Sequence, residues 1–278
     1  MLRPRIIPCL LVKNGGLVKT EKFAHPKYVG DPINAVKIFN EKEVDELIVV
    51  DIDATVLNRE PDYGLIRNLA AECRMPLCYG GGVKSVDQVE RIVSLGVEKV
   101  AISSAVVSDP ELVTKIAKRV GNQSVVVVLD VKRRLIGGRY EVWTHNGKKN
   151  TGKCPIEFAQ QMERLGVGEI VINSIDNDGV MKGYEFALVD QIRESISVPM
   201  TFLGGAGSLK DIGQLISKYG IIGAAAGSLF VFKGVYRAVL ISYPSRSEKD
   251  ILIMKASRAA SHVGYAAVSH GSCLRTVG

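Results

Sequence analysis

The sequence predicts an α/β protein, a TIM (β/α)8 barrel of two similar half-barrels with a C-terminal extension. Short apolar runs alternate with helical patterns along the whole chain. These runs are apolar at successive positions, as in parallel strands that are buried on both faces. The second half of the chain also repeats the first. Two matched halves of four strand–helix units favour a closed barrel over an open doubly wound sheet, which is the alternative.

The candidate strands occupy residues 5–11, 46–51, 77–79, 99–103, 124–130, 169–174, 200–203 and 223–226. Helical patterns lie between them, and several carry a start signal. A first-turn proline follows a helix-start residue in Asp31-Pro32, Asp109-Pro110 and Cys154-Pro155. The segments from Ser85 to Asp87 and from Ser208 to Asp211 resemble capping boxes with Asp in the acidic position.

The two halves share a series of residues in the same order. Examples are Lys13 and Lys132, Glu46 and Glu169, Gly80-Gly81 and Gly204-Gly205, and Ser104 and Ser228, at an offset of 119 to 124 residues. Solenoid units repeat at roughly 20 to 50 residues, so this longer period indicates two half-domains of one body. One equivalent pair differs in chemistry, because the first strand ends in Leu11 and the fifth in Asp130.

Length and composition are compatible with one large domain. The chain has 278 residues, 46% of them hydrophobic, which is enough for a sizeable core. We assign residues 1–254 to the barrel domain and 255–278 to a flexible tail without a functional role. The N-terminus lacks a signal-peptide pattern and no run of 18 apolar residues occurs, so we expect a cytoplasmic protein with no membrane partner.

Charge and cysteine content narrow the ligand classes. The net charge is +7, of which the tail contributes +3. The remaining positive charge suits a phosphorylated small-molecule ligand or reflects scattered surface lysines. The sequence has no basic stripe with interleaved aromatic residues, so we do not expect it to bind nucleic acid. The five cysteines are odd in number and lack metal-ligand spacing, so we expect reduced thiols, no metal and no cofactor.

Two glycine-rich segments follow predicted strands at equivalent places in the repeat. Gly80-Gly81-Gly82 comes after the third strand, and Gly204-Gly205-Ala206-Gly207 comes after the seventh. Each can present amide N–H groups near a helix start, which suits phosphate. Ser103-Ser104 and Gly227-Ser228 end the fourth and eighth strands and add hydroxyl donors. The pattern predicts a substrate with a phosphate at each end, although tight turns alone would explain one glycine cluster.

Carboxylates at the C-terminal ends of strands are the candidate acid/base groups. These are Asp130 at the fifth strand, Asp51 and Asp53 at the second, and Asp176 and Asp178 just past the sixth. Lys13, Lys19 and Lys132 lie near the same ends, where they attract anions, tune the acids or are only solvated.

Several motifs together resemble the cyclase subunit of imidazole glycerol phosphate synthase, the HisF family, over about residues 3–250. The motifs lie at residues 5–10, 80–82, 130–133, 147–152, 174–179 and 204–207. The resemblance implies a TIM barrel of two similar halves that forms a heterodimer with a glutaminase subunit. It further implies that ammonia from the glutaminase passes along the barrel interior. That ammonia is used to split and cyclise a substrate with two phosphates, giving imidazole glycerol phosphate and an aminoimidazole carboxamide ribotide.

The resemblance also assigns roles to residues. It implies a catalytic role for Asp130, but Leu11 stands where the family has its second catalytic aspartate. Asn173 replaces a usual Thr or Ser, and Leu203 replaces a usual Ser. The implied phosphate and substrate ligands are Lys19, Gly81, Gly82, Ser103, Ser104, Asp178, Gly179, Gly205, Gly207, Gly227 and Ser228. The implied ammonia gate is formed by Arg5, Glu46, Lys99 and Glu169. Glu98 matches an acidic position at the subunit interface.

Three hypotheses of function follow. Residues 10–20 resemble a divergent branch of the family that is found with surface-polysaccharide genes and is associated with installing an acetamidino group on a sugar. The leading hypothesis is that the chain receives ammonia for this modification, with a glutaminase and a separate amidotransferase-like protein as partners. The second is a cyclase of histidine biosynthesis that uses Asp130 with a substitute acid, Asp51 or Asp178. The third is a sugar-phosphate isomerase of the related single-chain type, which needs no ammonia partner.

Overall fold

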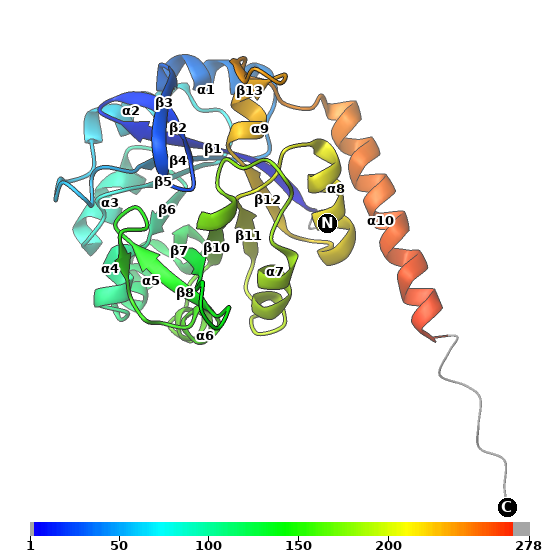
Figure 1. Cartoon of the computed structure of the whole chain (residues 1–278). Helices are drawn as coiled ribbons and strands as arrows, with labels where there is room; N and C mark the ends of the chain where they lie inside the picture. Colours follow the sequence, from blue (N-terminus) through cyan, green and yellow to red (C-terminus); the bar gives the residue numbers. More distant parts are fainter. Residues whose placement is uncertain (1–2, 269–278) are drawn as a thin grey trace, which may run out of the picture.

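Eight parallel strands close into a barrel at the centre of the molecule (Figure 1). The structure is a computed structural model that describes residues 3–268, with side chains described as far as residue 258. The barrel strands are β1 (Arg5–Lys13), β4 (Leu47–Asp51), β5 (Leu77–Gly80), β6 (Lys99–Ile102), β7 (Val125–Arg133), β10 (Glu169–Ser174), β11 (Met200–Leu203) and β12 (Gly223–Ala226). β10 pairs with both β7 and β11, and β12 pairs with β1, so the sheet closes. The predicted TIM barrel is confirmed.

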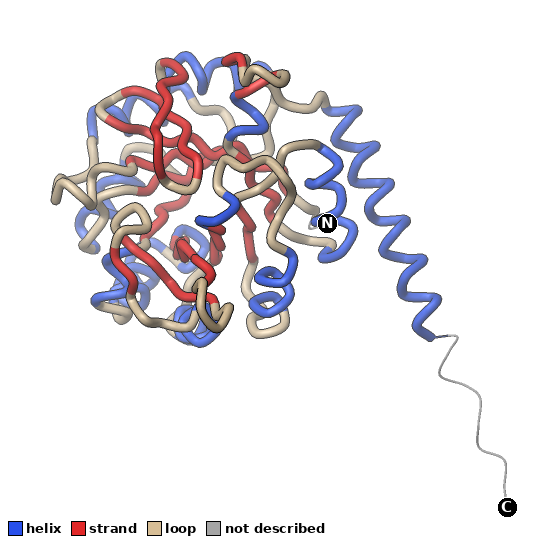
Figure 2. Tube along the Cα trace, viewed as in Figure 1, coloured by secondary structure: helices blue, strands red, loops and turns tan. Residues whose placement is uncertain are grey.

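Helices surround the strands (Figure 2). They are α1 (Pro32–Glu41), α2 (Tyr63–Glu72), α3 (Val86–Ser94), α4 (Ser104–Ser108), α5 (Leu112–Val120), α6 (Pro155–Arg164), α7 (Phe186–Arg193), α8 (Leu209–Tyr219), α9 (Ser228–Val231) and α10 (Arg246–Val268). The main core lies between the two layers, where strand residues such as Leu47 and Leu77 and helix residues such as Val89 and Ile92 are fully buried. Within the described residues, every helix is too short or too polar to cross a membrane.

The predicted helix starts are partly confirmed. Asp31 caps α1 by accepting from Asn34 N, and Ser208 and Asp211 form the predicted capping box of α8. In α3 the side chain that accepts from the backbone before the helix belongs to Gln88, not to the predicted Asp87. Gln88 Oε1 accepts from Lys84 N at 2.7 Å. The predicted start at Asp109-Pro110 is wrong, since the short helix α4 ends there and α5 begins only at Leu112.

Three hairpins were not predicted. They are formed by β2 (Gly16–Glu21) with β3 (Ala24–Gly30), β8 (Tyr140–Thr144) with β9 (Lys149–Asn150), and β13 (Phe232–Lys233) with β14 (Ala238–Val239). β1 and β7 both extend beyond the barrel, where they pair antiparallel with β2 and β8. The fifth strand was therefore predicted too short, and Ser124 belongs to a 3-10 turn, η1 (Asn122–Ser124), instead. Because each half begins with an extended strand and a hairpin, the internal repeat includes the hairpins that follow β1 and β7.

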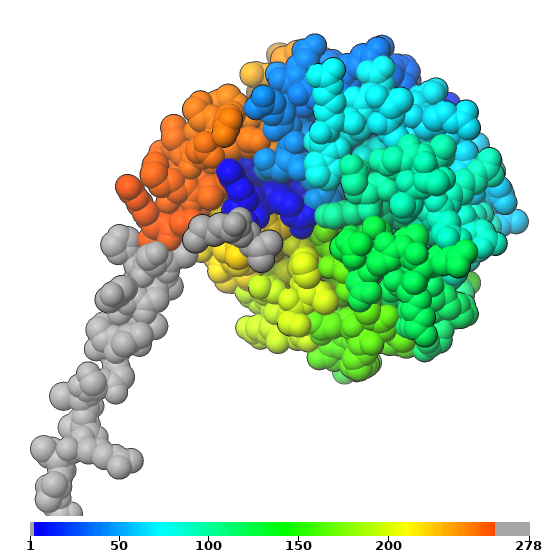
Figure 3. Space-filling model, turned by 180° about the vertical axis from the view of Figure 1, so that it is seen from behind, coloured from blue at the N-terminus to red at the C-terminus, as the bar shows by residue number. Residues whose placement is uncertain are grey.

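The long helix α10 packs beside α8 and runs through residue 254, where we expected the barrel domain to end. Leu252 approaches Gly213 of α8, and Ala256 is buried. The helix therefore continues past residue 254 to residue 268, and the division into a barrel domain and a tail stays a prediction. Residues 269–278 lie outside the described residues, and the expected flexibility of the tail stays a prediction. α10 lies at the side of the barrel, so its first part, in orange, is also visible from behind in Figure 3.

Candidate functional site

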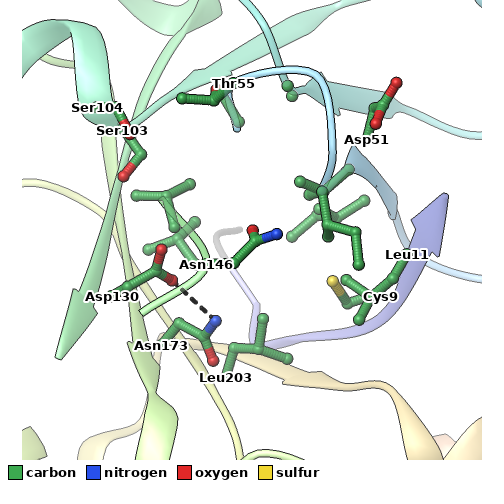
Figure 4. A pocket seen from close by; sticks show the side chains of 18 of the residues that line it. Cys9, Leu11, Asp51, Thr55, Ser103, Ser104, Asp130, Asn146, Asn173 and Leu203 are labelled. Carbon is green, nitrogen blue, oxygen red and sulfur yellow. Dashed lines mark hydrogen bonds between the residues drawn. The ribbon is translucent and has the colours of Figure 1, made fainter. Parts of the chain in front are cut away.

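A cavity of about 500 Å³ opens at the C-terminal ends of the barrel strands. Both halves of the barrel contribute to its wall (Figure 4). The predicted ligand residues that line it are Lys19, Gly81, Gly82, Ser103, Ser104, Asp178, Gly179, Gly205, Gly227 and Ser228. Ten of the eleven predicted ligand residues therefore line the same cavity.

Gly207 is the exception, because the cavity lining does not include it. Its amide N–H donates to Asp211 Oδ2 at 2.9 Å, within the capping box of α8. The prediction that Gly207 binds the substrate directly therefore finds no geometric support. The glycine instead serves the helix start, and an added Cβ would lie 2.2 Å from the carbonyl oxygen of Met181.

The two glycine loops have matching backbone conformations at equivalent positions. Gly81 has φ +117° and Gly205 has φ +111°, both in a region that residues with a side chain rarely adopt. A Cβ would lie 2.4 Å from the carbonyl oxygen of Asp51 at Gly81, and 2.0 Å from that of Gly183 at Gly205. Only glycine fits these close approaches, which hold the two loops at the rim of the cavity.

Asp130 lies inside the cavity and has one hydrogen-bonding side-chain partner among the described residues. Asn173 Nδ2 donates to Asp130 Oδ1 at 3.0 Å (Figure 4). Burial raises the pKa of Asp130 to about 7, although the bond from Asn173 lowers it. A carboxyl group with this pKa can give or take a proton near neutral pH, which suits general acid–base chemistry.

The equivalent place in the first half of the barrel is apolar. Leu11 pairs in register with Val50 between β1 and β4, just as Asp130 pairs with Asn173 between β7 and β10. Leu11 and Asp130 stand on opposite sides of the cavity in Figure 4. These two equivalent positions therefore differ, since one holds a polar pair and the other an apolar pair, and Leu11 occupies the place in the first half that matches Asp130 in the second.

Two of the other predicted carboxylates, Asp51 and Asp178, accept hydrogen bonds from nearby backbone or hydroxyl groups. Asp51 Oδ1 accepts from the amides of Asp53 and Ala54 at 3.0 and 3.1 Å. Asp178 Oδ2 accepts from Thr20 Oγ1 at 2.7 Å and from Phe23 N at 3.3 Å. These bonds fix a turn after β4 and the β2–β3 hairpin, so both carboxylates have a clear structural role.

Lys19 is buried although it lines the cavity. Its Nζ donates to the carbonyl oxygen of Cys9 and lies against Gly227, where an added Cβ would come within 2.5 Å. Burial lowers the pKa of Lys19, because the charged amine loses its hydration. The positive charge that we expected near an anion is thus enclosed between β1 and the end of β12.

The four predicted gate residues meet at the N-terminal end of the barrel and form a closed set of ion pairs, which we call the charged ring. Arg5 binds Glu46, and its Nη2 lies 2.6 Å from Glu169 Oε1. Lys99 Nζ lies 2.9 Å from Glu46 and 2.8 Å from Glu169. Burial alone would raise the pKa of Glu169, but its bonds to Arg5 and Lys99 lower it to about 2.

Above the charged ring, the interior is apolar. Its side chains include Ile7, Ile48, Val126, Val171 and Ala225, all buried in one cluster.

Glu98, the predicted interface residue, is exposed beside Lys99, and its Oε2 accepts from Leu77 N at 2.8 Å. Glu98 therefore also holds the start of β5.

Sequence reasoning did not assign several of the cavity residues to the site. Cys9, Thr55 and Asn146 line the cavity, and Asn146 extends into it from the turn between β8 and β9 (Figure 4). Asn146 has a positive φ of 56°, as does His145 before it, at 54°. Asparagine tolerates this conformation better than most residues, but the turn could be recognised only after the hairpin was known.

The fold and the site define a class of protein: a (β/α)8 barrel with a charged ring at one end and a cavity between paired glycine loops at the other. A model of the histidine biosynthesis protein family matches residues 5–237. The chain therefore belongs to that family, and it is a HisF-like member.

Similarity to individual relatives extends over most of the chain. A provisionally named imidazole glycerol phosphate synthase subunit hisF3 of Vibrio vulnificus is 59% identical over 90% of this chain and 96% of its own length. A subunit HisF of Leptospira interrogans, also provisionally named, is 55% identical over 91% and 99%. An imidazole glycerol phosphate synthase subunit HisF of Lactococcus lactis is 39% identical over 83% and 89%.

Proposed function

We propose that this chain accepts ammonia from a glutaminase partner, conducts it through the barrel, and supplies it for acetamidino-sugar formation in surface-polysaccharide biosynthesis. The observation that carries the proposal is the apolar pair Leu11 and Val50, which faces Asp130 and Asn173 above an intact charged ring. A separate amidotransferase-like protein is the second expected partner.

The lower half of the barrel supports an ammonia path. The charged ring closes the end at which the strands begin, and the apolar layer with Ile7, Ile48 and Val171 lies directly above it. An apolar layer admits neutral ammonia far more readily than a charged ion, because burying an unpaired charge is costly. Opening of the ring would give ammonia a dry route to the cavity.

The upper half supports a changed reaction. Loss of one positioned acid/base group costs about 10²- to 10⁴-fold in rate, and Leu11 cannot transfer a proton. The paired loops at Gly81 and Gly205 remain in place, so the cavity can still receive a phosphorylated small molecule. The two glycine loops are retained, but the first of the two acids is missing. This combination supports a barrel that keeps its ammonia path and no longer performs the ordinary cyclisation.

The second candidate is the cyclase of histidine biosynthesis. It is favoured by the pKa of Asp130, about 7, and by the relatives whose names give imidazole glycerol phosphate synthase. This candidate needs a substitute acid. Asp51 and Asp178 already accept backbone or hydroxyl hydrogen bonds, which makes both less suited to moving protons.

Turnover of the two-phosphate intermediate of histidine biosynthesis separates the candidates. The purified chain is mixed with its glutaminase, glutamine and this intermediate, and an ordinary cyclase serves as the positive control. We expect the chain to stimulate the glutaminase but to form product at least about 10²-fold more slowly than the control. A rate close to that of the control, or growth of a histidine-requiring strain that lacks its cyclase, would overturn the proposal.

A further inference from the structure

Asn173 holds a buried hydrogen-bond acceptor without a partner. Its Nδ2 donates to Asp130 Oδ1, so its Oδ1 points away from that carboxyl group. That oxygen, Oδ1, is buried and has no hydrogen-bond partner among the described residues, and the whole residue is 8% exposed. A buried carbonyl oxygen without a hydrogen-bond partner destabilises the protein. Such an atom at a cavity wall is a candidate ligand site.

The barrel fold does not require this amide. Val50 occupies the equivalent place in the first half and pairs with Leu11 in the same register. Two apolar residues thus fill the position there without any unpaired polar atom. The pair of Asn173 and Asp130 is therefore a local feature of the second half, at the point where the barrel interior opens into the cavity.

β10 leads from the charged ring to this amide. Its inward side chains, two residues apart, are Glu169 in the ring, Val171 in the apolar layer and Asn173 at the cavity. On the neighbouring strand β7, Val126 and Val128 lead in the same way to Asp130. On these two strands, Asn173 and Asp130 are the first polar side chains above the ring that face the interior.

The unpaired oxygen is turned away from the wide part of the cavity. Asn173 pairs in register with Leu203 of β11, and Figure 4 shows its oxygen beside the Leu203 side chain. Leu203 is therefore the side chain next to this oxygen on the neighbouring strand. On β10 the residue that carries this oxygen lies two positions beyond Val171 of the apolar layer.

We propose that Asn173 and Asp130 form a receiving site for ammonia or ammonium at the upper end of the barrel interior. The N–H groups of the ligand donate to Asn173 Oδ1, and Asp130 holds the same amide through its hydrogen bond to Nδ2. The ligand supplies the donor that Asn173 lacks, and the carboxylate favours the ammonium form. This inference rests on the proposed function, because only an ammonia-conducting barrel delivers the ligand from this side.

Nuclear magnetic resonance of the full chain, labelled with ¹⁵N, tests the site through the side-chain amide of Asn173. We expect a saturable shift of this signal with ammonium chloride. Tetramethylammonium chloride, which has the same charge but no N–H group, should cause no such shift. Asn34→Leu makes the same chemical change as Asn173→Leu at an exposed position of α1, outside the cavity, and should bind ammonium like the wild type.

Two variants act on the unpaired oxygen itself. Leu203→Ser places a hydroxyl beside Asn173 Oδ1, where it competes with the ligand, and should weaken ammonium binding roughly tenfold. Asn173→Leu removes the acceptor and should weaken binding to a similar extent, with the backbone amide of Ser174 as reporter. Thermal unfolding of each variant shows whether weaker binding results from loss of the folded structure. If Asn173→Leu does not fold, Leu203→Ser alone tests the site.

The outcomes distinguish this site from the proposed function. Equal shifts with both salts, or unchanged ammonium binding in the foldable variants, overturn the receiving site and leave the proposed function standing. Turnover of the histidine-biosynthesis intermediate at an ordinary rate overturns the proposed function, whatever the titration shows.

Discussion

Asn173 and Asp130 face each other across β10 and β7, with Asn173 Nδ2 3.0 Å from Asp130 Oδ1. The bond holds the carboxyl group in one orientation and occupies only one of its oxygens. Burial nevertheless raises the pKa of Asp130 to about 7. The charge of the cavity therefore changes in the neutral range, and the stability of the protein must change with it.

Asp130→Asn is expected to remove one pH-dependent part of the free energy of unfolding. The folded pKa of about 7 exceeds the unfolded value of about 3.9, so the folded chain binds this proton more tightly. The stabilisation is complete below about pH 4 and is lost as the pH rises towards 7. Relative to the variant, the wild type should lose roughly 2 to 4 kcal/mol across this window, measured by urea unfolding. Parallel pH profiles for the two proteins would contradict the assignment.

Glu169→Gln should destabilise the charged ring. Glu169 accepts from Arg5 and Lys99 at 2.6 and 2.8 Å, and removing its charge leaves two half-buried cations with one carboxylate. We expect a loss of about 3 kcal/mol in the free energy of unfolding near neutral pH. In the wild type the contribution of Glu169 is present above about pH 4.3 and is lost as the pH falls towards 2, because its folded pKa is lowered.

Glu41→Gln is the matched control, because Glu41 is exposed at the end of α1. It should change stability by less than about 0.5 kcal/mol. An equally small effect of Glu169→Gln in urea unfolding would show that the ion pairs of the ring contribute no net stability.

Gly205→Ala should disrupt the loop after β11. The new Cβ would lie 2.0 Å from the carbonyl oxygen of Gly183, and the backbone φ of +111° is unfavourable for alanine. We expect a loss of at least about 2 kcal/mol by urea unfolding. Gly152→Ala is the control for backbone conformation alone, because Gly152 has φ +69° and no atom lies within 4 Å of an added Cβ. It should lower the free energy of unfolding by about 1 kcal/mol. Equal losses would show that the close contact is relieved elsewhere.

The sequence predicted those parts of the fold that depend on local periodicity. Apolar runs located all eight barrel strands, and their order placed Arg5, Lys99 and the two ring glutamates at one end. Contacts that depend on register between distant strands could not be predicted. The bond from Asn173 to Asp130 joins residues 43 positions apart, and it exists only because β10 and β7 pair directly.

Hydrogen bonds of the candidate acids show the same limit. Asp178 looked free to act as an acid because it follows a strand, but its carboxylate binds Thr20 and Phe23 of a hairpin that has little apolar alternation. The N-terminal hairpin strand β3 is exposed at five of its seven positions, so burial imposed no recognisable pattern on its sequence.

Lys249→Met should loosen the attachment of α10 to the barrel. Lys249 is 6% exposed, and its Nζ lies 2.8 Å from Asp45 Oδ1 and 2.9 Å from the carbonyl oxygen of Glu43. Asp45 Oδ2 in turn accepts from Ile6 N at 2.9 Å, next to Arg5 of the charged ring. Removing the cation leaves the carboxylate of Asp45 without its ion-pair partner, so we expect a loss of about 3 kcal/mol. Lys255→Met, at an exposed position of the same helix, should change stability by less than about 0.5 kcal/mol.

A double-mutant cycle identifies the origin of this loss. We expect the uncompensated charge of Asp45 to be the cause. The double variant with Asp45→Asn and Lys249→Met should then lose about 1 to 2 kcal/mol less stability than the two single losses added together. The neutral amide can still accept from Ile6 N, so the start of β1 keeps its hydrogen bond in the double variant. Additive losses in urea unfolding would mean instead that Lys249 stabilises α10 through packing on Tyr243, whose ring centre lies 5.1 Å from Nζ.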